Sequence, residues 1–191
     1  PGMPLGVRII ALVIIVAAPA LLLSLAWPGA TRVALYGVLA TAFAWIPGGP
    51  RVAAIVVTSL AVLGSIVILL EGQTWALALI LVLLGIGYGL AASRGIGAAV
   101  LQLPILVPYF MMDPPGIFTP DDPQITVSYI LATIAVTALA GLWTIFVLHK
   151  AVGVRVLKRI EVTDPRLPIV YGTILGIVAA AVMAVSTSLS F

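Results

Sequence analysis

Long apolar runs make up most of this sequence, and they restrict what the chain can fold into. Nine basic and six acidic residues occur among 191, so charged residues are only 8% of the chain, whereas a soluble domain carries about 25%. A helix needs about 20 apolar residues to cross a bilayer. Runs of this length or somewhat shorter cover residues 9–27, 33–47, 52–70, 74–92, 96–112, 125–148 and 167–191. The sequence therefore predicts an all-α, polytopic transmembrane helix bundle of about seven helices.

The first two runs allow other interpretations. Run 33–47 is short and ends in the helix-breaking sequence PGGP, so it could instead form half of a shallow hairpin with run 9–27. Run 9–27 follows Arg8 and has Ser24-x-Ala26 near its end, as a secretory signal peptide would. It is longer than the apolar core of such a signal, which favours a retained helix.

Basic residues divide unevenly between the two sides that alternating helices would define. Arg32 stands alone on one side. The other side holds Arg8, Arg51, Arg94, Lys150, Arg155, Lys158, Arg159 and Arg166. Cytoplasmic segments of membrane proteins carry the excess of Lys and Arg, so the N-terminus is predicted to be cytoplasmic. The same orientation follows if the first two runs only dip into the membrane, because the number of crossings then changes by two.

Two connections are long enough to have a structure of their own. Residues 113–124 hold four prolines and three acids, which predicts a rigid loop rather than a helix. Residues 150–166 form a basic cytoplasmic linker, with apolar residues at helical spacing opposite Lys158 and Arg159. That pattern suits a short helix on an anionic membrane surface. A solvated basic turn that only sets the topology fits it equally well.

No charged residue falls well inside an apolar run. A charge at the middle of a bilayer costs about 2.5–3.5 kcal/mol or more and is retained only for a use, such as ion coupling. His149, the single histidine, adjoins Lys150 at the end of a run, where an interfacial role is expected rather than a proton relay. Paired carboxylates, an HExxH motif and a Ser/His/Asp set are all missing, so we do not expect an enzyme. Metals, cofactors and nucleic acids are not expected as partners either.

Small and weakly polar residues form stripes along single faces of several runs. Threonines at steps of seven, four and seven share one face of run 125–148: Thr126, Thr133, Thr137 and Thr144. Glycine pairs spaced four apart occur in runs 74–92 and 167–191: Gly85, Gly89, Gly172 and Gly176. Such faces let helices approach closely in a membrane, so packing is the main interpretation. A substrate path is the alternative for Thr133 and Thr137.

Run 96–112 contains two prolines spaced four apart, Pro104 and Pro108, just after Gln102. Each proline removes a backbone N–H and frees a carbonyl one turn earlier. Discontinuous helices of this kind build binding sites in transporters, which makes these three residues, together with Tyr88, candidates for a substrate pathway. A kinked helix that only packs, with Gln102 capping the freed carbonyls, is the equal alternative.

The order of these features resembles that of a known family. A helix led by Arg51 is followed by one ending in AASRG at 91–95, then by AAVLQLPILVPYF, a basic linker, and a fresh helix beginning DPRLPIVYGTILG. This arrangement is similar to the fusaric acid resistance and aromatic acid exporter family of bacterial inner-membrane proteins. The resemblance implies a six-helix half at 1–149, a linker at 150–166, and a seventh helix at 167–191 that begins a second half.

Two functions follow from these patterns. The resemblance implies an inner-membrane transporter-like protein that exports aromatic or amphipathic organic acids, with an anionic small molecule as its substrate. The alternative is a non-catalytic accessory or scaffold subunit that packs beside a larger membrane complex, which the absence of buried charge favours. In either role the chain is expected to be embedded in lipid as a homo-oligomer or within a larger assembly.

Overall fold

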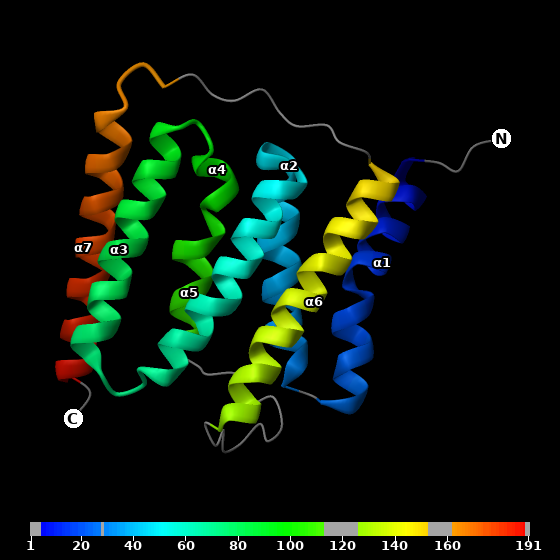
Figure 1. The fold of residues 1–191 in the computed structure, drawn as a ribbon, viewed down its shortest axis with the longest axis horizontal. Coiled ribbons are helices and arrows are strands. Elements are labelled where there is room, and N and C mark those ends of the chain that lie inside the picture. Colours follow the sequence, from blue (N-terminus) through cyan, green and yellow to red (C-terminus); the bar gives the residue numbers. More distant parts are fainter. Residues whose placement is uncertain (1–4, 28, 113–125, 153–161, 190–191) are drawn as a thin grey trace.

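All the described elements are helices. The computed structural model of the chain describes residues 5–27, 29–112, 126–152 and 162–189. The helices are α1 (Leu5–Ala26), α2 (Ala30–Leu69), α3 (Thr74–Ser93), α4 (Gly97–Val100), α5 (Gln102–Met112), α6 (Val127–Ala151) and α7 (Arg166–Leu189) (Figure 1). The loop predicted at 113–124 lies outside the described residues, as does the part of the linker at 153–161 where a surface helix was considered.

Helix α2 contains the second and third apolar runs and changes direction between them. Gly49 has a φ of 74° and a ψ of −174°, a conformation that glycine adopts far more readily than other residues. Pro47 and Pro50, on either side, weaken the helix at the same place. Figure 1 shows the chain turning back here, so a first arm (30–48) and a second arm (50–69) run in opposite directions.

The helices form two groups joined by a short segment. Helices α1 and α6 pack on α2, whereas α7 packs on α3. Although α2 and α3 are consecutive in the sequence, their backbones hardly approach each other, and α4 and α5 lie against both (Figure 1). The α4–α5 segment therefore bridges the two groups.

Side chains fill the interface between α2 and α6. Thr133, Thr137 and Thr144 of α6 are fully buried there, and their hydroxyls donate to carbonyls of their own helix at 2.8–2.9 Å. On the α2 side, Thr41 is also fully buried, and its hydroxyl has no hydrogen-bond partner among the described residues. This interface thus contains one polar group that the packing leaves unsatisfied.

Glycine backbones form the interface between α3 and α7. A Cβ added to Gly85 would lie 2.7 Å from Cα of Gly176 and would also collide with the carbonyl of Gly172. A Cβ on Gly89 would lie 2.7 Å from the carbonyl oxygen of Pro168. The two Gly-x-x-x-Gly pairs therefore face each other, and the backbones approach as closely as glycines allow.

A proline in α1 leads to a contact with α6. Pro19 lies inside α1 and has no N–H to donate to the carbonyl of Ile15, four residues earlier. The indole Nε1–H of Trp143 on α6 donates to that carbonyl oxygen at 2.8 Å. The group that the proline leaves open is therefore satisfied by another helix, as a nonaqueous surrounding requires.

Exposed basic residues cluster toward one end of the molecule. The C-terminal ends of α3 and α6, the beginning of α7 and the turn in α2 lie at that end (Figure 1). The exposed side chains there are Arg51, Arg94, Lys150 and Arg166. Arg32 and Glu71, also exposed, lie near the ends of α2 at the opposite side.

Four helices are long and apolar enough to cross a membrane, judged by length and composition: α2, α3, α6 and α7. Shorter apolar helical stretches cover Ile9–Leu23 and Gly97–Met111. The expected count of seven is not confirmed, and three segments account for the difference. The second and third runs are counted together in α2, although the non-helical Gly49 separates two arms of opposite direction. The first run and the 96–112 run give only the shorter apolar stretches Ile9–Leu23 and Gly97–Met111.

Candidate functional site

Helical hydrogen bonding in the 96–112 run is interrupted at Val100, four residues before Pro104. Helix α4 ends at Val100, whose carbonyl would accept from residue 104 if that residue had an N–H. Helix α5 begins at Gln102, so Pro104 falls in its first turn, where N–H groups lack helical partners in any case. Leu101, the residue between α4 and α5, keeps helical angles (φ −54°, ψ −28°), so Pro104 removes a hydrogen bond without changing the helical path of the chain.

Pro108 does not interrupt α5, although the sequence predicted a break at each proline. The helix continues past it to Met112. Phe110 explains this difference, because its fully buried ring packs edge-on against Tyr36, with centroids 5.2 Å apart. The same ring lies against Gly64, where an added Cβ would be 3.1 Å away. Packing on α2 therefore holds the turn that Pro108 weakens.

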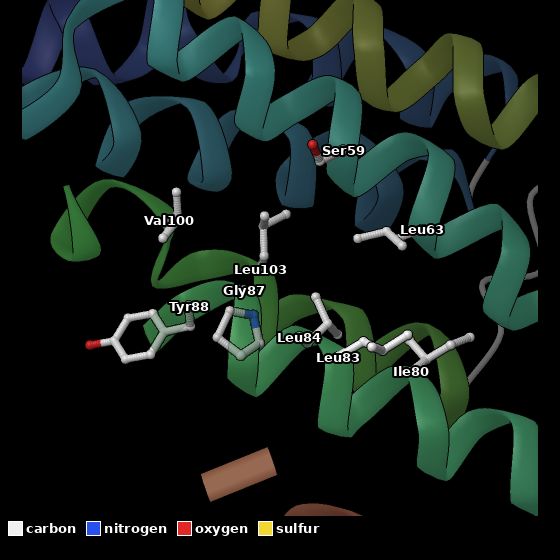
Figure 2. A pocket seen from close by; sticks show the side chains of 10 residues that line it. Ser59, Leu63, Ile80, Leu83, Leu84, Gly87, Tyr88, Val100 and Leu103 are labelled. Atoms are coloured by element: carbon white, nitrogen blue, oxygen red, sulfur yellow. The ribbon is translucent and has the colours of Figure 1, made fainter. Parts of the chain in front are cut away.

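A cavity lies between the two helix groups, and we name it the seam cavity. Its volume is about 310 Å³, within the range of ligand pockets of ~300–1,000 Å³. The second arm of α2, together with α3, α4 and α5, supplies its walls (Figure 2). The lining residues are Ser59, Leu63, Ile80, Leu83, Leu84, Gly87, Tyr88, Val100, Leu103 and Pro104.

The seam cavity is apolar apart from Ser59 and Tyr88. The Ser59 hydroxyl makes no hydrogen bond within the described part of the chain. Figure 2 shows the Tyr88 ring at one end of the cavity, with its hydroxyl directed away from the other labelled side chains. A Cβ on Gly87 would meet no atom within 4 Å. The cavity can therefore hold an apolar body and offers one hydroxyl to it.

A shallow groove continues from the seam cavity along the outside of α2. Its volume is about 600 Å³, and it shares Ser59 and Leu63 with the cavity. Thr58 adds a second hydroxyl. The seam cavity thus opens sideways, along the face of a helix that is apolar enough to lie in a bilayer.

A second cavity, which we name the α7 cavity, lies nearer the N-terminal end of α3. Its volume is about 420 Å³. Helices α3, α5 and α7 supply its lining residues, which are Thr74, Leu77, Leu81, Pro108, Met111, Ala179, Val182, Met183, Ser186 and Thr187. No lining residue is shared with the seam cavity, but α3 and α5 contribute to both.

The structure divides the predicted pathway residues among four places. Pro104 and Tyr88 line the seam cavity, and Pro108 lines the α7 cavity. Gln102 is partly buried at the start of α5 and lines neither cavity, and its side-chain amide makes no hydrogen bond to another described residue. Thr133 and Thr137 lie in the α2–α6 interface and line neither cavity. Their hydroxyls donate to backbone carbonyls of α6.

Gly87 and Ser59 are lining residues that the sequence patterns did not single out. Gly87 lies between the two glycines of a Gly-x-x-x-Gly pair. Residues spaced four apart share a helix face, whereas a residue two positions away projects on nearly the opposite side. Gly85 and Gly89 therefore face α7 while Gly87 faces the seam cavity. Helical spacing could therefore have indicated that Gly87 faces away from α7. No sequence pattern indicated Ser59.

The described residues contain no group of three or more His, Cys, Asp or Glu side chains that could hold a metal ion. Comparisons with known protein families, with curated proteins and with solved structures found no match. The cavities, the interrupted helix and the charge distribution are accordingly the observations from which a function can be argued.

Proposed function

We propose that this protein is a multi-pass transporter-like protein of the bacterial inner membrane that exports aromatic or amphipathic organic acids. Its membrane crossings would be α1, the two arms of α2, α3, the α4–α5 segment, α6 and α7, with the N-terminus in the cytoplasm. The alternating direction of these segments (Figure 1) and the basic residues gathered at one end support this topology. The resemblance in sequence order to aromatic acid exporters supports the substrate class.

The seam cavity is the observation that carries this proposal. It lies where the two helix groups meet, and the interrupted α4–α5 segment forms part of its wall. Transporter sites are commonly formed by discontinuous helices between bundles that move against each other. Because α2 and α3 hardly approach each other directly, a change in the separation of the two groups would open or close this cavity mainly by altering the contacts of α3 with α4 and α5.

The chemistry of the seam cavity fits the aromatic part of such an acid. Its lining holds no charged side chain, so a carboxylate ion placed among these residues would have no compensating charge. Arg51 and Arg94, exposed at the basic end, would instead attract the anion to the surface before it enters. The expected cargo therefore combines an apolar ring with a single acidic group.

Gly87 offers a sharp test, because a larger side chain there would fill the seam cavity without meeting another atom at its Cβ. Cells expressing the protein should accumulate less radiolabelled naphthoate than cells without it. The Gly87→Leu variant should lose this effect while remaining in the membrane at the same level. Gly6→Leu is the matched control, because Gly6 is also helical and open at its Cβ position but lies in α1.

Two results would contradict the proposal. One is equal accumulation with and without the protein across a panel of aromatic acids. The other is unchanged export by Gly87→Leu when the variant is shown to be folded.

A second candidate function, that of an accessory or scaffold subunit, is favoured by the position of α7. This helix packs chiefly on α3, and large apolar side chains such as Val170, Ile174 and Val178 are more than half exposed. A membrane partner or a second copy could cover that surface. Purification in mild detergent tests the idea, since a stoichiometric larger partner would support it, and a chain that is isolated alone and still exports acids would exclude it.

A further inference from the structure

The α7 cavity is built differently from the seam cavity. Its lining residues come from α3, α5 and α7, whereas α2 and α4 contribute to the seam cavity. Pro104 and Pro108 of α5 are four residues apart and therefore lie on one face of that helix, about one turn from each other. The first lines the seam cavity and the second lines the α7 cavity. The same face of α5 thus passes along both cavities in succession.

Two methionines face the α7 cavity from different helices, Met111 from α5 and Met183 from α7. Thioether sulfur makes favourable contacts with aromatic rings, and the flexible methionine side chain adapts to ligands of different shape. Leu77 and Leu81 of α3 supply branched apolar surface opposite α7. This combination suits a planar aromatic ring better than an aliphatic chain, because only the ring gains the favourable contact with the sulfur atoms.

Hydroxyl groups supply the polar part of the α7 cavity. The Ser186 hydroxyl donates to the carbonyl of Met183 at 2.9 Å, so its oxygen atom can still accept. The Thr187 hydroxyl donates to the carbonyls of Met183 and Ala184, each at 3.0 Å. The Thr74 hydroxyl makes no hydrogen bond within the described ranges and can donate to a ligand. No charged side chain lines the cavity, so an ionised group inside it would be uncompensated.

We propose that the α7 cavity is a second binding site, which takes an uncharged aromatic molecule or the neutral form of an aromatic acid. The site extends the proposed export function, because α5 would present one face to the cargo at two successive positions. The ring would lie between Met111 and Met183, and its small polar group would bond to the hydroxyls of Thr74 and Ser186.

Photolabelling of the purified full chain in lipid nanodiscs tests this site directly. Benzophenone is uncharged and aromatic, and on illumination it bonds covalently to nearby C–H groups, which peptide mapping by mass spectrometry then locates. We expect the label on Met111 and Met183. Naphthalenemethanol should compete with the label, whereas decanol at the same membrane concentration should not. Equal competition by decanol would assign the cavity to a lipid acyl chain and overturn the proposal.

Variants of α7 establish whether the label reports the cavity. Val182→Phe should lower labelling roughly tenfold or more. The larger side chain would occupy part of the cavity, and an apolar pocket that is too small by even one methylene loses about that factor in binding. Val182 is 63% exposed, so the substitution does not disturb the helix interface. Ala179→Leu narrows the cavity from the same helix and should act in the same direction. The matched control is Ala181→Leu, an exposed alanine of α7 outside the cavity, which should label normally.

Undiminished labelling in both cavity variants would overturn the proposal. Gly87→Leu separates this outcome from failure of the proposed export function. The variant fills only the seam cavity, so labelling of the α7 cavity should persist in it whether or not export is lost. Binding is measured here without any export, and each proposal can therefore fail while the other stands.

Discussion

The interface between α2 and α6 and the interface between α3 and α7 solve the same problem in opposite ways. Membrane helices gain little from burying apolar side chains against each other, because lipid is equally apolar, so close packing and hydrogen bonds must hold them. The first interface has one close glycine contact, Gly37 against the backbone carbonyl of Thr137, but otherwise spreads its contacts over many side chains and is covered further by α1 and α5. The second depends on a few glycine backbones. A substitution at a glycine of the second interface should consequently cost more than one at a side-chain contact of the first.

The largest effect is expected for Gly85→Leu in the α3–α7 interface. The new side chain would collide with the backbone of Gly172 and Gly176, which cannot rotate away as a side chain can. Overpacking of this kind costs about 1–3 kcal/mol, and more where backbone must move. Thermal unfolding in detergent should show a clear drop in midpoint, with Gly6→Leu as control. An unchanged midpoint would show that α7 is not held by these glycines.

A smaller loss is expected for Gly141→Ala in the α2–α6 interface. A Cβ there would meet side-chain atoms, the methyl of Val57 and, at 2.7 Å, the hydroxyl oxygen of Thr41. Side chains can adjust, so we expect a destabilisation near the lower end of the overpacking range, about 1 kcal/mol. Gly85→Ala, measured in parallel, should cost more. If the two alanine variants are equally stable, the contrast between the interfaces is wrong.

A loss of similar size is expected for Trp143→Phe, which removes the indole donor to the Ile15 carbonyl. Hydrogen bonds between membrane helices contribute about 0.6 kcal/mol on average and up to about 2. In the Pro19→Ala background the helix can satisfy that carbonyl itself, so Trp143→Phe should cost less. A double-mutant cycle from thermal unfolding measures this coupling. If the two destabilisations add strictly, the Trp143 hydrogen bond does not compensate for the N–H that Pro19 lacks.

The smallest change is expected for Thr41→Val, and its sign is opposite. The Thr41 hydroxyl is buried, and no described residue bonds to it, so its removal relieves a desolvation cost. We expect a gain of up to about 1 kcal/mol. Thr133→Val serves as the comparison, because that hydroxyl already bonds to the Tyr129 carbonyl and its loss should be near neutral or slightly unfavourable. A destabilised Thr41→Val would reveal a partner for this hydroxyl.

Sequence patterns predicted the helical class of the fold and much of its segmentation. Run 74–92 nearly coincides with α3, and run 167–191 contains most of α7. This agreement has a simple cause, since backbone groups in an apolar medium must bond within their own segment, which leaves helices as the available form. The break expected at PGGP is also present, because Gly49 is non-helical and the two arms of α2 run in opposite directions.

The candidate cavities were much harder to predict. Helical spacing shows which residues share a face, but it does not show which face meets which helix. Thr133 and Thr137 share a face as expected, yet that face packs on α2. Gly87 gained its importance from the separation of α2 and α3, which depends on contacts across the whole molecule. Met183 joins Met111 only because α7 returns along α3 after a long interval in the sequence.

The bond from Trp143 to Ile15 also has a consequence for how the chain is assembled. The two residues are 128 positions apart, so α1 is synthesised well before its donor exists. During that interval the carbonyl left open by Pro19 would have to remain near water or bond to another molecule, because an unsatisfied backbone group in hydrocarbon costs several kcal/mol. Once α6 has been synthesised and packed, Trp143 can donate to this carbonyl. The proline thus makes the final placement of α1 depend on a helix that is synthesised much later.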